Sequence, residues 1–259
     1  MKNILKLISP FETLDKKGSI MVKGFWILLI IGGWFISSSI SETHLFPTPA
    51  QVGDGFVGLY QEGLIVHLFS SLSLFLKATL ISIFLSLSIV YLSPLPLMSP
   101  VANIISKFRF LPLTGLSYYI AILVNDGRSI QTWILVIFMS TFLITSLMAS
   151  LKGIEEDIDH ARTLGCNRWE ILYEVIIKGR LDYIIESIRQ NLAIVWMSLV
   201  IVEGILASAG GLGFLIKNSD KFMNHGRIIA LQLIILGVGL FLDFALTKIR
   251  KISFRYSNF

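Results

Sequence analysis

The residue types that most often carry enzyme chemistry are sparse in this 259-residue chain and are not grouped. The histidines do not repeat at the spacing of metal ligands; they are His44, His67, His160 and His225. The Gly-x-x-x-x-Gly-Lys-Ser/Thr loop that cradles nucleotide phosphates is missing from the sequence. No nucleophile and base stand in a recognisable catalytic pattern. The sequence therefore predicts a chain that is not an enzyme, holds no metal and binds no cofactor of its own.

Polar residues inside otherwise apolar stretches are the candidates for contact with a transported solute, namely Lys77, Asn191 and Glu203. An ionised group at the centre of a membrane-spanning helix costs at least about 2.5 kcal/mol, so such groups are usually kept for a function. Glu203 is expected either to line a pathway or to hydrogen-bond between packed helices. Lys77 is expected either to pair with Glu203 or to face a water-filled cavity. Asn191 is expected at the mouth of the helix that carries Glu203.

The main concentration of charge lies between residues 155 and 180, with long apolar runs on both sides. Two apolar stripes recur there at helical spacing: Ile154, Ile158, Ala161 and Leu164, then Trp169, Leu172, Val175 and Ile176. Gly165 fits a helix end, where glycine takes the left-handed conformation without steric cost. Asn167 and Glu170 have the spacing of a capping box. The pattern predicts two short amphipathic helices outside the membrane, within a loop of residues 152–185.

Composition indicates that the rest of the chain lies in a membrane. Hydrophobic residues make up 54% and charged residues only 15% of the chain, whereas soluble domains carry roughly 25% charged residues. About six apolar runs are long enough to cross a hydrocarbon core: Val22–Ile40, Leu68–Leu92, Leu97–Val124, Ile130–Leu151, Leu192–Ala209 and Ile228–Thr247. We therefore predict one all-α membrane domain over residues 1–259, with about six transmembrane helices.

Lysine and arginine are distributed unevenly among the connecting segments, and this predicts the orientation. Residues 41–67 contain neither, whereas cations gather before the first helix, in the 152–185 loop and after the last helix. By the positive-inside rule, that loop and both termini are cytoplasmic. The net charge of +5 then reflects loop bias rather than a nucleic-acid partner. The first helix could instead be a cleaved signal peptide, but the long polar segment ahead of it favours retention.

The segment Asp159-His160-Ala161-Arg162-Thr163-Leu164-Gly165, followed by Arg168-Trp169 and a hydrophobic helix, resembles the "EAA" loop of ABC-importer permeases. In that family Glu-Ala-Ala, three residues and Gly form short helices that dock into a groove of a cytoplasmic ATPase. Asp159 stands for the Glu, His160 and Ala161 for the alanines, and Gly165 for the Gly. His160 is larger than alanine, and Lys178 stands where many members have proline. The resemblance assigns ATPase coupling to these residues: Asp159, His160, Ala161, Leu164, Gly165, Arg168, Trp169 and Leu172.

Further matches extend the resemblance over residues 46–216. The segment Phe46-Pro47-Thr48-Pro49-Ala50-Gln51-Val52 is similar to one in the nitrate/sulfonate/taurine-type branch, and Phe108-Arg109-Phe110-Leu111-Pro112-Leu113 to its proline-bearing third helix. Glu203 with Gly210-Gly211-Leu212-Gly213-Phe214-Leu215-Ile216 is similar to its Glu … Gly-Leu-Gly-Tyr-Leu-Ile segment. The resemblance implies a permease in a prokaryotic inner membrane. It also implies pairing with a second copy, a cytoplasmic ABC ATPase dimer that binds ATP-Mg, and a periplasmic or lipid-anchored solute-binding protein.

Two other classes of membrane protein remain as alternatives. A secondary transporter would need an ion-coupling site and usually internal repeats, and the sequence has no such repeat. It would also leave the 155–180 segment without a use. A membrane enzyme would need the catalytic arrangement that is missing. The resembled branch handles nitrate, sulfonates, taurine and other small organic molecules, and Lys77 and Arg109 are compatible with an anion.

Overall fold

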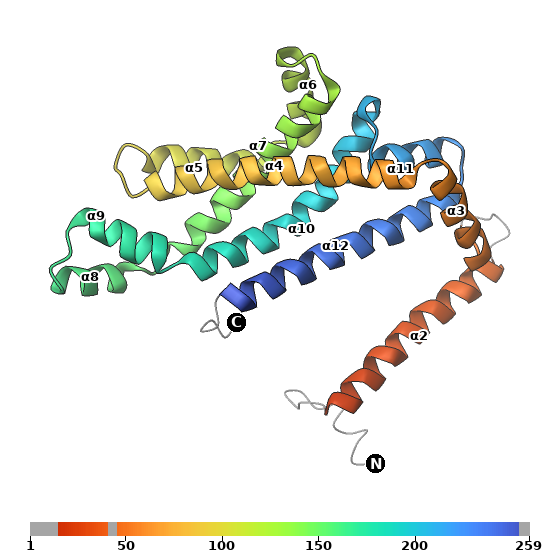
Figure 1. The fold of residues 1–259 in the computed structure, drawn as a ribbon, viewed down its shortest axis with the longest axis horizontal. Coiled ribbons are helices and arrows are strands. Elements are labelled where there is room, and N and C mark those ends of the chain that lie inside the picture. Colours follow the sequence, from red (N-terminus) through yellow and green to blue (C-terminus); the bar gives the residue numbers. More distant parts are fainter. Residues whose placement is uncertain (1–14, 41–45, 254–259) are drawn as a thin grey trace.

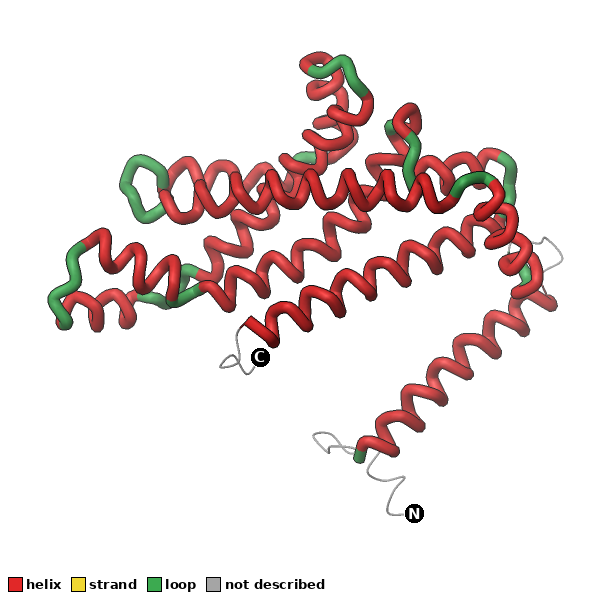
Figure 2. Tube along the Cα trace, viewed as in Figure 1, coloured by secondary structure: helices red, strands yellow, loops and turns green. Residues whose placement is uncertain are grey.

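The computed structural model describes residues 15–40 and 46–253, which form only helices and connecting loops (Figure 1, Figure 2). Within them, 5 helices are long and apolar enough to cross a membrane: α2 (Lys16–Ile40), α4 (Leu64–Leu92), α7 (Gly127–Ser150), α10 (Leu181–Ile205) and α12 (His225–Ser253). The shorter elements are α3 (Pro49–Gln61), α5 (Ser99–Lys107), η1 (Phe108–Phe110), α6 (Leu113–Leu123), α8 (Glu155–Thr163), α9 (Arg168–Ile171), η2 (Leu172–Lys178), η3 (Ala207–Ala209) and α11 (Leu212–Lys221). The predicted all-α membrane class is confirmed. Both termini, with their predicted orientation, lie outside the described residues.

Helix α7 forms the centre of the bundle, because apolar residues surround much of its circumference. Its apolar side chains that are at most 1% exposed are Ile134, Leu135, Val136, Met139, Leu143, Ile144 and Leu147. It packs against α4, α5, α6 and α10. The contact with α4 is close, since Ser82 and Ser86 donate hydrogen bonds to the carbonyl oxygens of Val136 (3.2 Å) and Ser140 (3.4 Å). Small polar residues let helices approach closely where lipid offers no hydrogen bonds.

The expected third span, Leu97–Val124, is two helical segments rather than one helix. The segment α5–η1 ends at Phe110 and α6 begins at Leu113. Between them, Leu111 is extended (φ −74°, ψ 131°) and Pro112 is the N-cap of α6. Proline pushes the preceding residue out of the helical region and has no N–H to continue the hydrogen-bond ladder. The chain therefore turns here, and α6 stands away from the line of α4 and α5 (Figure 1).

The fifth predicted helix begins earlier than expected, at Leu181 instead of Leu192. Charged residues interrupt the apolar run there, but they stay within the helix because they pair with one another. Arg189 binds Glu186 (2.7 Å) and also Asp243 of α12. Glu186 also accepts a hydrogen bond from Arg250 of α12 (2.6 Å). This ion-pair cluster ties the amino-terminal part of α10 to the carboxyl-terminal part of α12.

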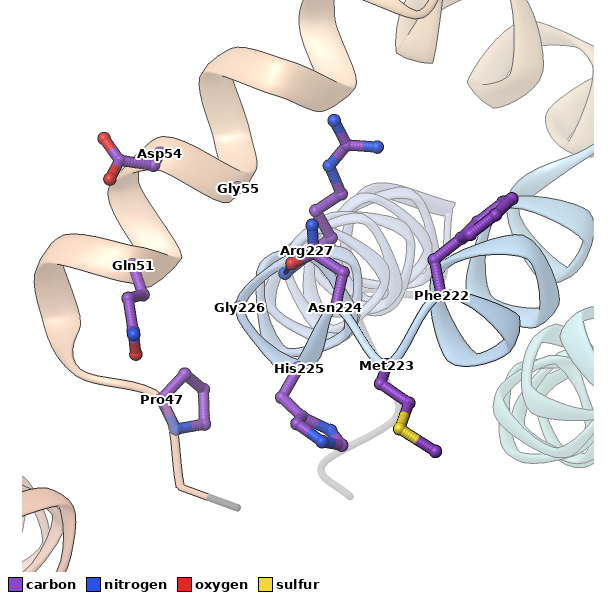
Figure 3. Close-up of a pocket in the computed structure, with 10 residues that line it drawn as sticks. All are labelled: Pro47, Gln51, Asp54, Gly55, Phe222, Met223, Asn224, His225, Gly226 and Arg227. Atoms are coloured by element: carbon purple, nitrogen blue, oxygen red, sulfur yellow. Dashed lines mark hydrogen bonds between the residues drawn. The ribbon is translucent and has the colours of Figure 1, made fainter. Parts of the chain in front are cut away.

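Short helices lie at the two ends of the bundle. The α8–α9 segment protrudes at one end, while α3 and α11 lie at the other (Figure 1). Helix α3 begins at Pro49, and Thr48 caps it through a capping box with Gln51. A cavity of about 500 Å³ opens beside α3, and Figure 3 shows its other wall, the turn between α11 and α12. A Cβ on Gly55 would lie 2.9 Å from the carbonyl of Gly226, so α3 and α12 cross in close contact.

Helix α2 stands apart from the other long helices (Figure 1). None of the residues in its most apolar stretch is buried inside the molecule. One side-chain contact with the following segment is the hydrogen bond from Trp34 Nε1 to the carbonyl oxygen of Pro47 (3.1 Å). A helix with apolar residues on all sides and no protein around it is suited to lipid or to a second protein chain.

Candidate functional site

Residues 155–178 fold into α8, a turn, and the continuous α9–η2 segment, which we call the 155–178 pair. Gly165 has a φ of 83° and its N–H donates to the carbonyl oxygen of Arg162 (3.0 Å), which closes α8. Asn167 Oδ1 accepts hydrogen bonds from the N–H groups of Trp169 (2.8 Å) and Glu170 (3.1 Å). The Glu170 carboxylate accepts the N–H of Asn167 in return (2.7 Å). The glycine turn and the capping box predicted from the sequence are both confirmed.

Side chains of the 155–178 pair and of the residue before it are buried where α8 packs against α9 and η2 and where η2 contacts α4. Ile154, Ala161, Ile171 and Ile176 are between 5% and 9% exposed. Between the pair and the bundle lies a cavity of about 470 Å³, bordered by the end of α4, by α5 and by the end of α7. The pair is therefore held by apolar contacts but has unfilled space beneath it.

The tip of the 155–178 pair is apolar and exposed. Leu164 and Trp169, which belong to the two apolar stripes, are 78% and 66% exposed. The other sequence-predicted coupling residues at this tip are exposed or half-buried: Asp159, His160, Arg168 and Leu172. A patch of large apolar side chains with charged neighbours is typical of a surface that binds another protein.

The second half of the pair leads directly into α10. The turns of η2 are wide, and the N–H of Gly179 donates to the carbonyl oxygen of Glu174 (3.0 Å). A Cβ on Gly179 would lie 2.6 Å from the carbonyl oxygen of Val175, so glycine fits best there. Lys178, which stands where many members of the resembled family have proline, binds Glu174 at 2.8 Å, and this hydrogen bond raises the pKa of Lys178. Arg180 then binds Asp157 of α8 at 3.0 Å, so both helices of the pair are joined to the start of α10.

Glu203 lies at the opposite end of α10 and is 0% exposed. Its carboxylate accepts hydrogen bonds from the Ser71 hydroxyl (2.8 Å) and the Gly213 N–H (3.1 Å). Of the two expectations for Lys77, pairing with Glu203 is wrong, because the cation beside Glu203 is Arg128, with Nη1 3.5 Å away. Sequence reasoning missed Arg128 because it follows a polar loop, where arginine is normally solvated. The signal that could have identified Arg128 was the predicted topology, which places it at the same end of the bundle as Glu203.

The structure does not bring the three pathway candidates together. Asn191 is 3% exposed, and its amide donates to the Ser146 hydroxyl (2.9 Å) and the Ser187 carbonyl oxygen (2.7 Å). Asn191 therefore joins α10 to α7. Lys77 lies on the exposed face of α4. Of the three, Lys77 is the one whose side chain is open to its surroundings.

Within residues 15–40 and 46–253, no group of 3 or more His, Cys, Asp or Glu side chains is arranged to hold a metal ion. Cys166 is a free, half-buried cysteine in the turn of the 155–178 pair.

Known proteins of similar sequence are permeases, although no protein-family model matches the chain. The taurine transport system permease protein TauC of Escherichia coli K12 is 27% identical over 151 residues, 57% of this chain and 54% of that protein. A probable ABC transporter permease of Brucella melitensis is 27% identical over 221 residues, 82% of this chain and 87% of that protein. A putative ABC transporter permease of Methanocaldococcus jannaschii is 30% identical over 135 residues, 51% of each protein.

The fold agrees with these relationships. A solved structure described as an amino acid ABC transporter with histidines has a TM-score of 0.60 and 17% sequence identity to this chain. The alignment covers 78% of this chain and 97% of the other. At this identity the likeness concerns the fold. By sequence, the chain is similar to ABC transporter permeases.

Proposed function

We propose that this permease forms the membrane path of an importer for a small anionic solute, and that the 155–178 pair receives the conformational change of a cytoplasmic ATPase. Two copies of the chain would enclose the path. An ABC ATPase dimer would bind ATP-Mg beneath them, and a periplasmic or lipid-anchored solute-binding protein would deliver the solute from the other side. In this arrangement the chain spans a prokaryotic inner membrane with both termini in the cytoplasm.

The observation that carries the proposal is the exposed tip of the 155–178 pair. Leu164 and Trp169 are 78% and 66% exposed, and they belong to none of the described helices that are long enough to span a membrane. Burial of apolar surface in a partner's groove contributes about 25 cal/mol per Å². The tip therefore has the chemistry of a protein-docking surface at a water-exposed end of the molecule.

Movement of the docked pair would reach the membrane through α10. Only Gly179 and Arg180 separate η2 from α10, and Arg180 is bound to Asp157 of α8 at 3.0 Å. The cavity of about 470 Å³ between the pair and the bundle gives the pair room to shift. A displacement of the pair would thus move the end of a spanning helix.

The charge of the solute is inferred from Lys77. Its side chain is exposed on α4, on a face that it shares with Leu76 and Leu80. A lysine in contact with lipid near the middle of a span is costly, but one that faces a water-filled path is not. We therefore assign Lys77 to the wall of the path, where it would favour anions. Glu203 and Asn191 are buried and hydrogen-bonded, so we assign them indirect roles in the path.

Purification of the tagged chain from its native membrane in mild detergent tests the proposal. We expect a subunit that hydrolyses ATP to co-purify in stoichiometric amount. The double variant Leu164→Ser, Trp169→Ala should reduce its recovery at least about tenfold, as expected for apolar anchors of an interface. The matched control is Phe222→Ser, Met223→Ser, which alters side chains of similar exposure (70% and 79%) at the α3–α11 end. Absence of an ATPase subunit, or equal loss in both double variants, would contradict the proposal.

A further inference from the structure

The amino end of α11 is fastened by side chains of other helices. A helix leaves its first N–H groups without partners of its own. Here the Gly211 N–H donates to His67 Nδ1 (3.1 Å) and the Leu212 N–H to Ser71 Oγ (2.9 Å). The Gly213 N–H donates to Glu203 Oε2 (3.1 Å). Since His67 and Ser71 belong to α4 and Glu203 to α10, the start of α11 is bound to two of the spanning helices.

The same carboxylate also joins α7 to this cluster. Arg128 at the start of α7 lies 3.5 Å from Glu203 and donates to the Ser70 hydroxyl (2.6 Å) and to Gln131 Oε1 (2.9 Å). Gln131 in turn donates to the carbonyl oxygen of Leu206, at the end of α10 (2.8 Å). We call this set of contacts the Glu203 latch; it consists of Ser71, Arg128, Gln131, Glu203 and residues 210–213. Four helices thus meet at one buried carboxylate.

The turn that leads into α11 fits closely against this carboxylate. Gly210 and Gly211 have φ values of 74° and 110°, which residues other than glycine rarely adopt. A Cβ on Gly211 would overlap the Glu203 carboxylate. The negative charge lies at the positive end of the α11 dipole and next to a guanidinium, and both partly offset its loss of hydration. The close fit between the Glu203 carboxylate and the Gly210–Gly211 turn therefore fixes how the start of α11 lies against α10.

The location of the latch gives it a functional consequence. It lies at one end of α10, while the 155–178 pair lies at the other end of the same helix. A shift of α10 relative to α4 and α7 would separate Glu203 from Ser71 or from Arg128. The Glu203 side chain is fully buried, whereas the Arg128 side chain is 29% exposed. Separation of the two would therefore leave the carboxylate buried without its cation, which is unfavourable. Such a contact favours two discrete arrangements, latched and fully opened, over intermediate ones.

We propose that Glu203 and Arg128 are positioning residues for transport: they hold α11 across the ends of α4, α7 and α10, and they set the balance between a closed and an open arrangement of this end of the path. This inference rests on the proposed function, in which α10 is moved from its opposite end. Neither residue contacts the solute in this scheme.

A cysteine reporter beside the latch tests the inference in the full-length chain in membranes. The native Cys166 is replaced by serine, and Ala207 of η3, which is half-buried, is replaced by cysteine. The rate of labelling by a charged, membrane-impermeant thiosulfonate is measured for the parent, for Glu203→Gln, and for Glu203→Gln with Arg128→Gln. The double variant contains no unpaired buried charge, so it remains informative if the single variant folds poorly. We expect both variants to be labelled at least about tenfold faster than the parent, because coupling between sites typically changes an equilibrium by about 5- to 150-fold.

A purely structural role gives a different result. In that case Glu203→Gln would lower the melting temperature and the double variant would restore it. The double variant would then be labelled at the parent's rate, and this result would overturn the inference. Ser71→Ala should give a smaller increase, since it removes one hydroxyl of the latch. Ser82→Ala is the matched control; it removes another buried hydroxyl of α4, which binds the carbonyl oxygen of Val136 (3.2 Å), and it should leave labelling unchanged.

Failure of the proposed function can be told apart from failure of the latch. Labelling needs neither an ATPase nor a solute, whereas ATP hydrolysis by the assembled complex reports the coupling. Faster labelling without any ATPase partner would uphold the latch and contradict the function. Unchanged labelling in a complex that co-purifies and hydrolyses ATP would uphold the function and overturn the latch.

Discussion

Arg180 donates a hydrogen bond to Asp157 across 3.0 Å and so ties the residue before α10 to α8. Asp157 lies in the first turn of α8, and Arg180 follows the end of η2. This salt bridge therefore joins the two ends of the 155–178 pair. Leu164 and Trp169 lie at its opposite end, at the turn between α8 and α9. A displacement of the tip would therefore reach α10 through both helices of the pair.

Arg180→Gln should reduce coupling without unfolding the protein. We expect the ATP hydrolysis of the reconstituted complex to respond to the solute-binding protein about threefold less, because contacts between coupled sites are typically worth 0.5–2 kcal/mol. The melting temperature should change little, since partly exposed ion pairs contribute about 0–1 kcal/mol. The control is Lys178→Gln, which breaks the Lys178–Glu174 pair (2.8 Å) within η2 but no contact to α8. An equal effect of both variants would argue against the Arg180–Asp157 contact.

Gly165→Ala should loosen the turn of the 155–178 pair. A Cβ at this position meets no atom within 4 Å, but the φ of 83° costs an L-residue about 1–2 kcal/mol. Gly165→Asn should be milder, because asparagine tolerates this conformation. Limited proteolysis of the 155–178 segment measures the effect. Gly237→Ala in α12 also meets no atom within 4 Å and has no positive φ, so it should not increase cleavage.

Two neighbouring glycines at the α10–α11 contact should respond unequally to alanine. A Cβ on Gly213 would overlap the carbonyl oxygen of Val200 and lie 2.7 Å from the amide nitrogen of Gly204. A Cβ on Gly204 would lie 3.5 Å from the Gly213 carbonyl oxygen, which is ordinary contact. Gly213→Ala should therefore lower the free energy of unfolding by about 1–3 kcal/mol more than Gly204→Ala. Thermal unfolding in detergent measures the difference, and similar melting temperatures would refute the close contact.

Asp126 should give a pH-dependent contribution to the stability of α7. It is the N-cap of that helix, and the hydrogen bond from the Ser129 N–H (2.8 Å) lowers the pKa of Asp126. A lowered pKa in the folded state means that the contribution is present above the unfolded pKa of aspartate and is lost as pH falls through the lower folded value. The melting-temperature difference between the parent and Asp126→Ala should therefore shrink in acid. Asp126→Ser, which caps without titrating, should show a pH-independent difference from Asp126→Ala.

Local structure in the 155–178 pair could be predicted from the sequence because its determinants are close in the chain. The glycine turn needs only Gly165, and the capping box needs only Asn167 and Glu170. In each case one or two residues decide the backbone geometry through contacts within a single helical turn.

Contacts between distant segments could not be predicted in the same way. The partner of Glu203 depends on which face of α7 meets α10, and hydropathy does not report that. Arg189 pairs with Asp243 and Glu186, which extends α10 beyond the apolar run used to predict it. The break at Pro112 was visible in the sequence, but the apolar residues on both sides of it suggested one continuous span. Periodicity placed Leu164 and Trp169 on apolar stripes but did not tell which members of each stripe are exposed.

Site-specific cross-linking from the tip of the 155–178 pair tests ATPase coupling most directly. Leu164→Cys is introduced with Cys166→Ser, and a short thiol-reactive cross-linker is added to membranes that contain the assembled complex. We predict a cross-linked product between this chain and the ATPase subunit, whose yield changes when ATP is added. Met223→Cys, 79% exposed at the other end of the molecule, should give no such product. Absence of the product from Leu164→Cys in a complex that retains the ATPase would contradict coupling through this pair.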